Sequence, residues 1–150
     1  MVPLGGGKDP FASLRFFVDI GDVITGSFRE CAGLGSETEL IETKETVKGG
    51  FTLFIKTPGA LKWENITLKR GITDSMQIWS WRKQVEEGDV EGARMNGSIV
   101  MYDSQNKDVA RWDFIRGWPR KVSGPSFNSA SNEIGVEELE IVHEGLVRKY

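Results

Sequence analysis

Residue types that do chemistry are sparse in this 150-residue chain, which contains one cysteine, Cys31, and one histidine, His143. A lone cysteine forms no internal disulfide, and one cysteine with one histidine is too few for a zinc site. Cys31 lies among small and apolar residues with no base nearby in sequence, which favours a buried structural thiol over a nucleophile. His143 stands beside Glu144, and no serine or cysteine motif marks a triad partner. The sequence therefore predicts no catalytic residue, no metal site and no cofactor.

One motif near the N-terminus, Gly5-Gly6-Gly7-Lys8, has the glycines and the lysine of a phosphate-binding loop. That loop needs a glycine, four residues and then Gly-Lys-Ser/Thr, all following a strand. Here Asp9-Pro10 follows the lysine and no strand precedes the glycines. We therefore expect residues 1–10 to form a flexible arm.

Composition and charge exclude several classes of protein. The chain has 19 Lys and Arg residues and 22 Asp and Glu residues, so its net charge is −3, and no basic block is present. Nucleic acid is thus disfavoured as a main partner, and we expect no sequence-specific recognition of it. No apolar run approaches the roughly 18–20 residues of a membrane span, and the N-terminus lacks the apolar region of a signal peptide. We expect one domain over residues 1–150, synthesised in the cytoplasm and without stable membrane anchoring.

Short runs of alternating apolar residues between glycine-rich turns predict a mainly β protein. Glycine accounts for 18 of the 150 residues, which is well above the usual share of about 7%. We expect turns at 57–59 and 103–108, and Pro119 should mark an edge, a strand end or a bulge. Six to eight short strands indicate a sandwich or barrel. The predicted strands lie at 14–20, 28–34, 51–55, 63–70, 98–102, 109–116 and 133–147.

One α-helix is predicted over residues 74–87. Asp74 can cap it, with Gln77 three residues later as in a capping box, and Gly88 ends it. Apolar residues at spacings of three and four form a stripe that should anchor the helix on a sheet. This stripe consists of Ile78, Trp81 and Val85.

Residues 36–56 differ from the rest, because 36–50 mixes charged residues with threonines and few apolar ones. The threonines and β-branched residues favour extended backbone, yet both faces of such a strand would be largely polar. It is either a strand that faces water on at least one side, as one arm of an extended hairpin or as the lining of an aqueous channel, or it is a solvated loop. Its charged residues are Glu37, Glu39, Glu42, Lys44, Glu45 and Lys48.

The turn and strand signatures, taken in order from about residue 9 to residue 150, form a recognisable series. They are Asp9-Pro10-Phe11, Glu30-Cys31-Ala32-Gly33-Leu34, Lys48-Gly49-Gly50, Lys56-Thr57-Pro58-Gly59, the run 66–73 before the helix with Trp79 and Trp81, the run 96–103, Trp112-Asp113-Phe114 with Trp118-Pro119, Gly124-Pro125, Asn132-Glu133-Ile134 and His143-Glu144-Gly145-Leu146. This series resembles the tail tube, or inner tube, proteins of contractile phage tails and phage tail-like contractile injection systems.

The resemblance implies a subunit without catalytic activity that folds as two packed antiparallel sheets with one helix. Six such subunits close into a ring with a β-barrel lumen, and the rings stack into a hollow tube. The implied partners are other copies of the chain, a contractile sheath, baseplate or tube-initiator proteins, terminator proteins, and tape-measure, DNA or effector cargo in the lumen.

Within this interpretation, the charged residues of 36–50 would face the lumen or a neighbouring ring. Phe51 and Phe54 would be buried where rings stack. The alternative is a monomeric, lectin-like β-sandwich that binds sugar on exposed tryptophans, for which Trp63, Trp112 and Trp118 are the candidates.

Overall fold

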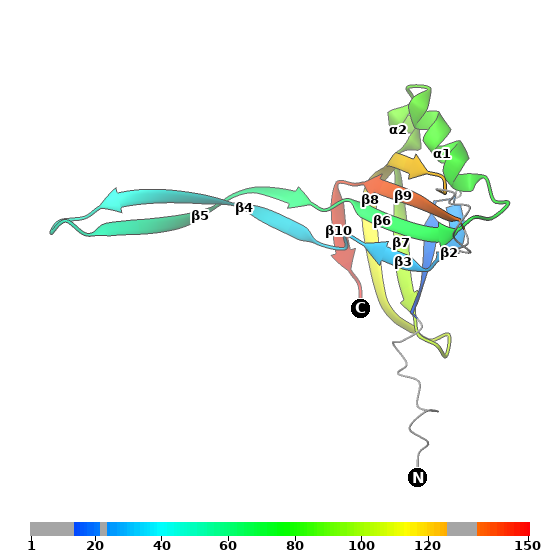
Figure 1. Cartoon of the computed structure of the whole chain (residues 1–150), viewed down its shortest axis with the longest axis horizontal. Helices are drawn as coiled ribbons and strands as arrows, with labels where there is room; N and C mark the ends of the chain where they lie inside the picture. Colours follow the sequence, from blue (N-terminus) through cyan, green and yellow to red (C-terminus); the bar gives the residue numbers. More distant parts are fainter. Residues whose placement is uncertain (1–13, 22–23, 126–134) are drawn as a thin grey trace, which may run out of the picture.

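Ten strands and two helices build the described part of the chain (Figure 1). The computed structural model describes residues 14–21, 24–125 and 135–150, so the expected arm at 1–10 and the motifs at 9–11 and 132–134 lie outside the described residues. In chain order the elements are β1 (Arg15–Ile20), β2 (Ile24–Phe28), β3 (Glu30–Ala32), β4 (Ser36–Thr46), β5 (Thr52–Trp63), β6 (Ile66–Gly71), α1 (Gln77–Glu86), α2 (Val90–Ala93), β7 (Met95–Tyr102), β8 (Asp108–Ser123), β9 (Val136–Val142) and β10 (Gly145–Arg148).

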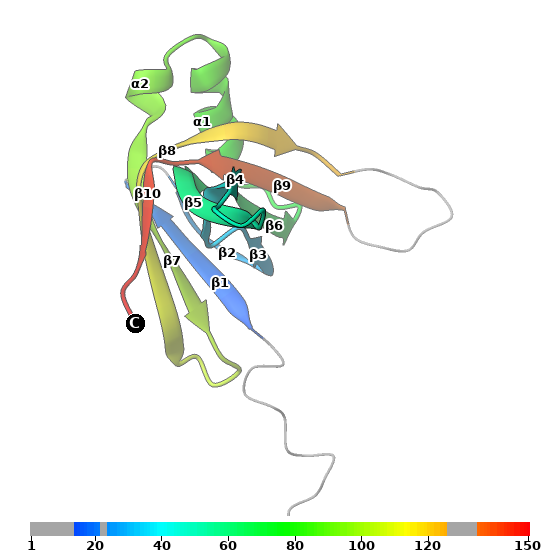
Figure 2. The same ribbon diagram turned by 90° about the vertical axis from the view of Figure 1, so that its left-hand side faces the viewer.

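Eight of these strands form two antiparallel layers that share β8. The first half of β8 pairs with β7 on one side and β10 on the other, and its second half pairs with β9. The full order is β2-β1-β7-β8-β9-β6-β3, with β10 beside β8. The prediction of two packed antiparallel sheets is confirmed. Strands β4 and β5 lie outside both layers as a two-stranded sheet, seen end-on in Figure 2.

The core lies between the two layers, because alternate residues of each strand point inward. In β6 and β9 this alternation buries two residues of each strand completely, and the register pairs Ile66 with Ile141 and Leu68 with Leu139. A slip of either strand by one residue would turn its two buried side chains to the opposite face, so burial fixes the register. The other buried apolar residues of this cluster are Val18, Ile20, Ile24, Phe28, Ile78, Trp81, Ala93, Ile99 and Phe114.

Two glycines within the strands make room for the ring of Phe114. A Cβ atom at Gly97 would lie 2.5 Å from Phe114 Cζ, and a Cβ atom at Gly117 would lie 2.5 Å from Phe114 Cε2. Carbon atoms cannot approach that closely, so neither position accepts a side chain unless the ring moves. The glycine excess therefore serves core packing as well as turns.

The predicted helix is present as α1, but the predicted cap is wrong. α1 begins at Gln77, and Met76 before it makes no capping hydrogen bond through its side chain. The chain enters the helix through two hydroxyl-mediated turns: the Ser75 N–H donates to Thr73 Oγ1 at 3.2 Å, and the Gln77 N–H donates to Ser75 Oγ at 3.5 Å. These local bonds replace the bond that Asp74 was expected to accept.

The apolar stripe of α1 faces the sheets. Ile78 is fully buried and Trp81 is 1% exposed, while Val85 is partly buried against the same core. Trp81 Nε1 donates to the carbonyl of Ala93 at 2.8 Å, which ties α1 to the short second helix, α2. The sequence did not predict α2, because four residues are too few to show a helical period.

Three predicted strand or turn positions are wrong and one expected irregularity is confirmed. The described part of the strand predicted at 133–147 is two strands, β9 and the start of β10. Residues 57–59 are not a turn, because they lie within β5. The predicted strand at 28–34 is the end of β2 followed by the separate strand β3. Pro119 marks a bulge, since the pairing of β8 with β9 shifts between Pro119 and Lys121.

Candidate assembly surface

The most prominent surface of the molecule is the hairpin formed by β4, β5 and their turn, residues 36–63. It projects far beyond the two layers (Figure 1). β4 has 11 residues, which at about 3.3 Å per residue gives an arm of roughly 36 Å. All 11 residues of β4 are exposed, so extended backbone forms here without any core beneath it.

Apolar side chains are concentrated on the hairpin. Of the 12 large apolar residues that are exposed among the described residues, seven lie within 36–63. A soluble monomer rarely gathers so many on one segment, and such a patch marks an interaction surface. These seven are Leu40, Ile41, Phe51, Leu53, Phe54, Ile55 and Leu61.

The turn of the hairpin presents a phenylalanine and a lysine at its far end. The Val47 N–H donates to the Phe51 carbonyl at 2.9 Å, and the Gly50 N–H donates to the Val47 carbonyl at 3.1 Å. Gly49 and Gly50 have φ angles of 103° and 83°, which glycine adopts without strain. Phe51, at 71% exposed, and Lys48 therefore stand at the tip of a well-formed turn.

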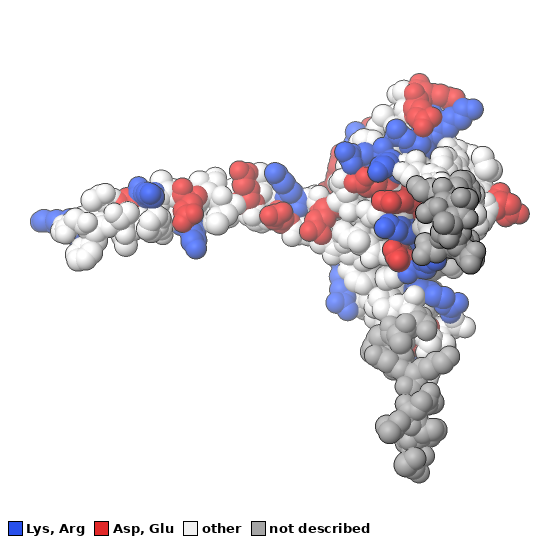
Figure 3. Space-filling model, viewed as in Figure 1, with Lys and Arg blue, Asp and Glu red and all other residues white. Residues whose placement is uncertain are grey.

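The strand register separates the predicted charged residues onto two faces. Successive residues of a strand point to opposite faces, and β4 runs without an inserted residue because the extra residue of the bulge is on β5. One face therefore carries Glu42 and Lys44, and the other carries Glu37, Glu39 and Glu45. Charged side chains of both signs are interspersed with uncharged ones along the arm (Figure 3). The five residues cannot all face one lumen.

Pro58 lies in the middle of β5, opposite Leu40, next to the bulge. Proline cannot donate to a ladder, and it is tolerated in strands that are edges or bulged. Both strands of an isolated hairpin are edges, so Pro58 costs little here. It also removes one donor from an otherwise long exposed edge, which limits indiscriminate pairing.

Where the hairpin joins the body, His143 connects the two parts. His143 is 6% exposed, and its Nε2 lies 3.0 Å from the carbonyl oxygen of Glu64, which follows β5. Its ring centroid lies 5.8 Å from that of Trp63, the last residue of the hairpin, and 6.1 Å from that of Phe114. Burial lowers the pKa of His143 below its ordinary value of 6.5, so the ring is neutral at pH 7 and donates to Glu64.

Beside this junction lies an open groove of about 750 Å³, which we call the root groove. Its lining comes from β1, β7, β8 and β10, together with Trp63 at the end of β5. Ile115 and Val147, which are 49% and 57% exposed, supply apolar surface. The groove residues used below are Asp19, Trp63, Asp113, Ile115, Glu144 and Val147.

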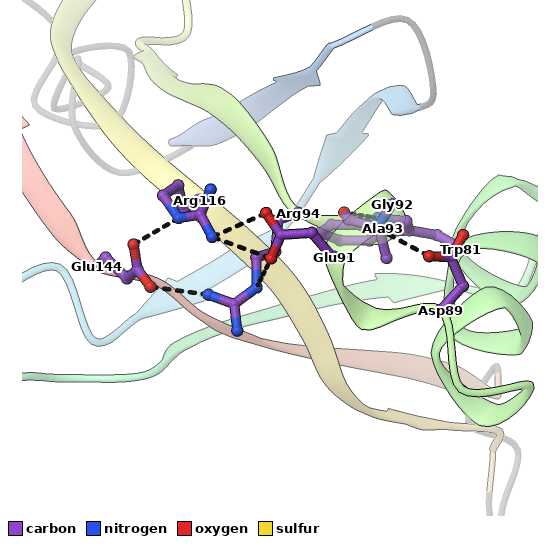
Figure 4. Close-up of polar contacts among 8 residues, drawn as sticks. All are labelled: Trp81, Asp89, Glu91, Gly92, Ala93, Arg94, Arg116 and Glu144. Atoms are coloured by element: carbon purple, nitrogen blue, oxygen red, sulfur yellow. Dashed lines mark hydrogen bonds and ion pairs between the residues drawn. The ribbon is translucent and has the colours of Figure 1, made fainter.

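A network of four charged side chains borders the root groove (Figure 4). Glu144 Oε1 accepts from Arg94 Nη1 at 2.8 Å, and its other oxygen lies 2.7 Å from Arg116 Nε. Both arginines also contact Glu91 of α2, at 3.2 and 3.0 Å. The network joins α2, β8 and the turn before β10, and so holds the rim of the groove in place.

The surroundings of Cys31 and the distribution of potential metal ligands favour structural roles over chemical ones. Burial raises the pKa of the Cys31 thiol to about 12, so it is not a thiolate at neutral pH. In the described ranges, no three His, Cys, Asp or Glu side chains are grouped to hold a metal ion. No helix in the described part of the chain has the length and apolarity needed to cross a bilayer.

The tryptophans proposed as a sugar platform are not displayed on the surface. Trp63, Trp112 and Trp118 are each half-buried. The guanidinium of Arg148 lies over the Trp112 ring at 5.6 Å, and Trp63 packs beside His143. Partial burial of all three rings, and contacts within the chain for two of them, argue against the lectin-like alternative.

The root groove was missed by sequence reasoning, because its residues come from five strands and the loops beside them. One signal was present. In β8 the buried Phe114 is followed by the exposed Ile115, an apolar residue at a position where the pattern of apolar inward and polar outward residues predicts a polar one. A single exposed apolar residue is common on protein surfaces, so this signal alone does not identify the groove.

Comparison with known proteins identifies the family. The family model described as T4-like virus tail tube protein gp19 matches residues 12–147. No curated protein matches the chain.

Solved structures share the fold over nearly the whole chain. A chain of the PVC sheath–tube complex, an extracellular contractile injection system in the extended state, is 24% identical with a TM-score of 0.75, covering 95% of this chain and 93% of that one. A chain of the anti-feeding prophage tube-terminating cap is 23% identical with a TM-score of 0.74, covering 99% of both. Hcp1 from Flavobacterium johnsoniae is 16% identical with a TM-score of 0.52, covering 89% of this chain and 94% of that one. With its family model matched over residues 12–147, the chain belongs to the T4-like virus tail tube protein gp19 family.

Proposed function

We propose that this chain is a structural, non-enzymatic subunit of the inner tube of a contractile injection system or a contractile phage tail. The observation that carries the proposal is the hairpin, which exposes seven large apolar residues in a chain of the tail tube family. The hairpin buries little of its apolar surface within one copy, so we expect neighbouring copies to bury that surface in the assembly.

Ring closure is the second part of the proposal. Among the described residues, β2, β3 and β10 each pair with a single neighbour, so each presents an unpaired edge. Unpaired edges invite uncontrolled association, and closing a sheet into a barrel removes them. Six copies in cyclic symmetry would join these edges into one β-barrel around a lumen.

Stacking of the rings would place the hairpin between layers of subunits. Phe51 and Phe54, which are 71% and 58% exposed, would then be buried between rings. The two faces of the hairpin divide the charged residues, so one set would meet the lumen and the other a subunit contact. Lys48, at the turn, would lie against the next ring.

The remaining partners follow from the same proposal. A contractile sheath would surround the tube, a baseplate or tube initiator and a terminator would bound it, and tape-measure protein, DNA or effector protein would occupy the lumen. PVC and anti-feeding prophage structures with sheath–tube, cap and baseplate assemblies share the fold, which supports this arrangement. We propose synthesis in the cytoplasm followed by incorporation into the particle.

Negative-stain electron microscopy of the purified full-length protein tests the proposal. Hollow rings with six-fold symmetry, alone or stacked into tubes, are the expected result. The proposal would be contradicted if the purified protein stays monomeric at every concentration and if no rings or tubes are seen in a preparation of the parent particle. A monomer that binds sugar on a defined surface would support the lectin-like alternative instead.

A further inference from the structure

In the part of the chain that the structure describes, the hairpin tip and the root groove are two exposed surfaces that carry apolar side chains. They lie at opposite ends of the hairpin, so they cannot reach each other within one copy. The groove lies at the root of the hairpin, where Trp63 is part of its lining. The hairpin leads away from it for roughly 36 Å, and its tip is the end of the arm that lies away from the body (Figure 1). Any contact between the tip and the groove must therefore join two copies.

We propose that the root groove of one copy receives the hairpin tip, residues 44–56, of a second copy. This inference rests on the proposed function and adds to it the receiving site. The groove's volume of about 750 Å³ falls within the 300–1,000 Å³ range of sites that enclose a drug-sized molecule, so it can seat several side chains.

Apolar burial supplies the main driving force for this contact. The tip carries four of the exposed apolar residues of the hairpin, and the groove offers the exposed Ile115 and Val147 with the half-buried Trp63 beside them. A phenylalanine in such a contact is the type of residue that dominates interface energies. The four are Phe51, Leu53, Phe54 and Ile55.

Charge complements the apolar contact. The tip contains Lys44, Lys48 and Lys56 with a single acidic residue, Glu45. The groove is lined by three acidic residues and one lysine, Lys149. The acids are Asp19, Asp113 and Glu144.

Part of the groove charge is already compensated within the chain. Asp113 Oδ1 accepts from Arg111 Nε at 2.9 Å, and Glu144 pairs with two arginines. The charges therefore orient the tip more than they hold it, as is general for partly solvated pairs.

The geometry of the contact makes it directional. The tip and the groove are different surfaces, so each copy offers both and the contact repeats head to tail. A contact between unlike surfaces closes into a ring or continues along a line, which is what a stacked tube requires. The reach of the hairpin limits the spacing of such copies to roughly the 36 Å of the arm plus the side chains at its end.

Cysteine cross-linking between two copies tests the proposal. Since Cys31 is the only native cysteine, Cys31→Ser gives a cysteine-free background. In that background one protein carries Lys48→Cys at the tip, which leaves Phe51 and Phe54 in place, and a second carries Val147→Cys in the groove. The two are mixed before assembly, oxidised mildly, and separated on a non-reducing gel. The matched control replaces Val147→Cys by Met76→Cys, which is similarly exposed, at 65%, but lies outside the groove.

Docking brings the two thiols to an effective concentration in the millimolar range. At micromolar protein we therefore expect the 48/147 pair to form mixed dimers on the order of a hundredfold faster than the 48/76 pair. Rings or tubes that form normally, with equal cross-linking of both pairs or more in the control, would overturn the groove assignment and leave the tube function standing. Protein that never assembles and shows no cross-link would overturn both.

Discussion

The hairpin and the strand pair β6 and β9 are both antiparallel, but they differ in how much of their side-chain surface is buried within one copy. Every residue of β4 is exposed, whereas alternate residues of β6 and β9 are buried without any exposed area at four positions. The strands of the body are fixed by their core, so they specify the fold of one copy. The hairpin has no core of its own, so its apolar side chains are available for contacts between copies.

The largest expected effect comes from the same substitution placed in each region. Phe114→Ala removes a ring that is 1% exposed between two close-packed glycines, and should lower the free energy of unfolding by about 3–5 kcal/mol. Phe54→Ala removes a ring that is 58% exposed, so dilute monomeric protein should change by no more than about 0.5 kcal/mol. Urea unfolding measures both.

Assembly should respond in the opposite order. Phe54→Ala protein should fold and yet form shorter tubes or none, as seen by electron microscopy. If Phe54→Ala assembles into long tubes as readily as the unmodified chain, the hairpin is not the stacking surface. Met76→Ala, on an exposed residue at the start of α1, is the matched control.

A second large effect is expected at the buried ion pair that links β6 to β9 within the body. Arg70 Nε donates to Glu137 Oε2 at 3.1 Å, and Trp79 Nε1 donates to Glu137 Oε1 at 2.9 Å. Glu137 is 2% exposed. Glu137→Ala leaves a buried guanidinium without its partner and should cost about 3–5 kcal/mol in thermal or urea unfolding.

The double variant Arg70→Met with Glu137→Leu separates charge from packing. Because it removes both charges together, it should recover much of that loss. A double variant as unstable as Glu137→Ala would show that packing around Trp79, and not the unpaired charge, sets the cost. Glu91→Ala, in the exposed network beside α2, should have a much smaller effect because solvent screens those charges.

The positions of most strands could be predicted from sequence, because alternation in runs such as 14–20 and 66–70 directly reflects a core beneath one face. Polar residues at 36–46 could not settle strand against loop, since no core imposes a period there. The turn predicted at 57–59 was wrong for a similar reason: a proline and a glycine are tolerated in an exposed, bulged hairpin, and only the long-range pairing with Leu40 reveals it.

The site itself was only partly predictable. The charged residues of the hairpin were recognised as a group, but their division between two faces depends on the β4 and β5 register. The root groove combines residues as distant as Asp19 and Val147, and no local pattern joins them. The capping residue of α1 was mistaken because Thr73 and Ser75 offered competing hydroxyls.

The two faces of the hairpin provide a third and smaller test. Glu39→Lys and Glu42→Lys are equal charge reversals on opposite faces of one strand. If one face meets the lumen, reversal there should alter cargo retention while tubes persist, and reversal on the other face should weaken assembly. Cargo content by gel and tube length by microscopy measure the two outcomes. Identical effects from both variants would contradict a division of roles between the faces.

The smallest expected effect concerns His143, which stands between the two regions compared. Because burial lowers its pKa below 6.5, the unfolded chain takes up a proton at a higher pH than the folded chain does. Stability is therefore complete above about pH 6.5 and is lost as the pH falls from there toward the lowered pKa of the folded state. Protonation would place a positive charge between Trp63 and Phe114 at the root of the hairpin.

Thermal unfolding between pH 5.5 and 7.5 measures this loss. His143 is the only histidine of the chain, so this slope should flatten in His143→Gln, whose side-chain amide can still donate to Glu64. An unchanged slope in His143→Gln would assign the pH dependence to other groups. If amide exchange at low pH opens first in the residues around Trp63 and Glu64, and the strands β6 and β9 stay protected, the junction is the point at which the hairpin separates energetically from the body.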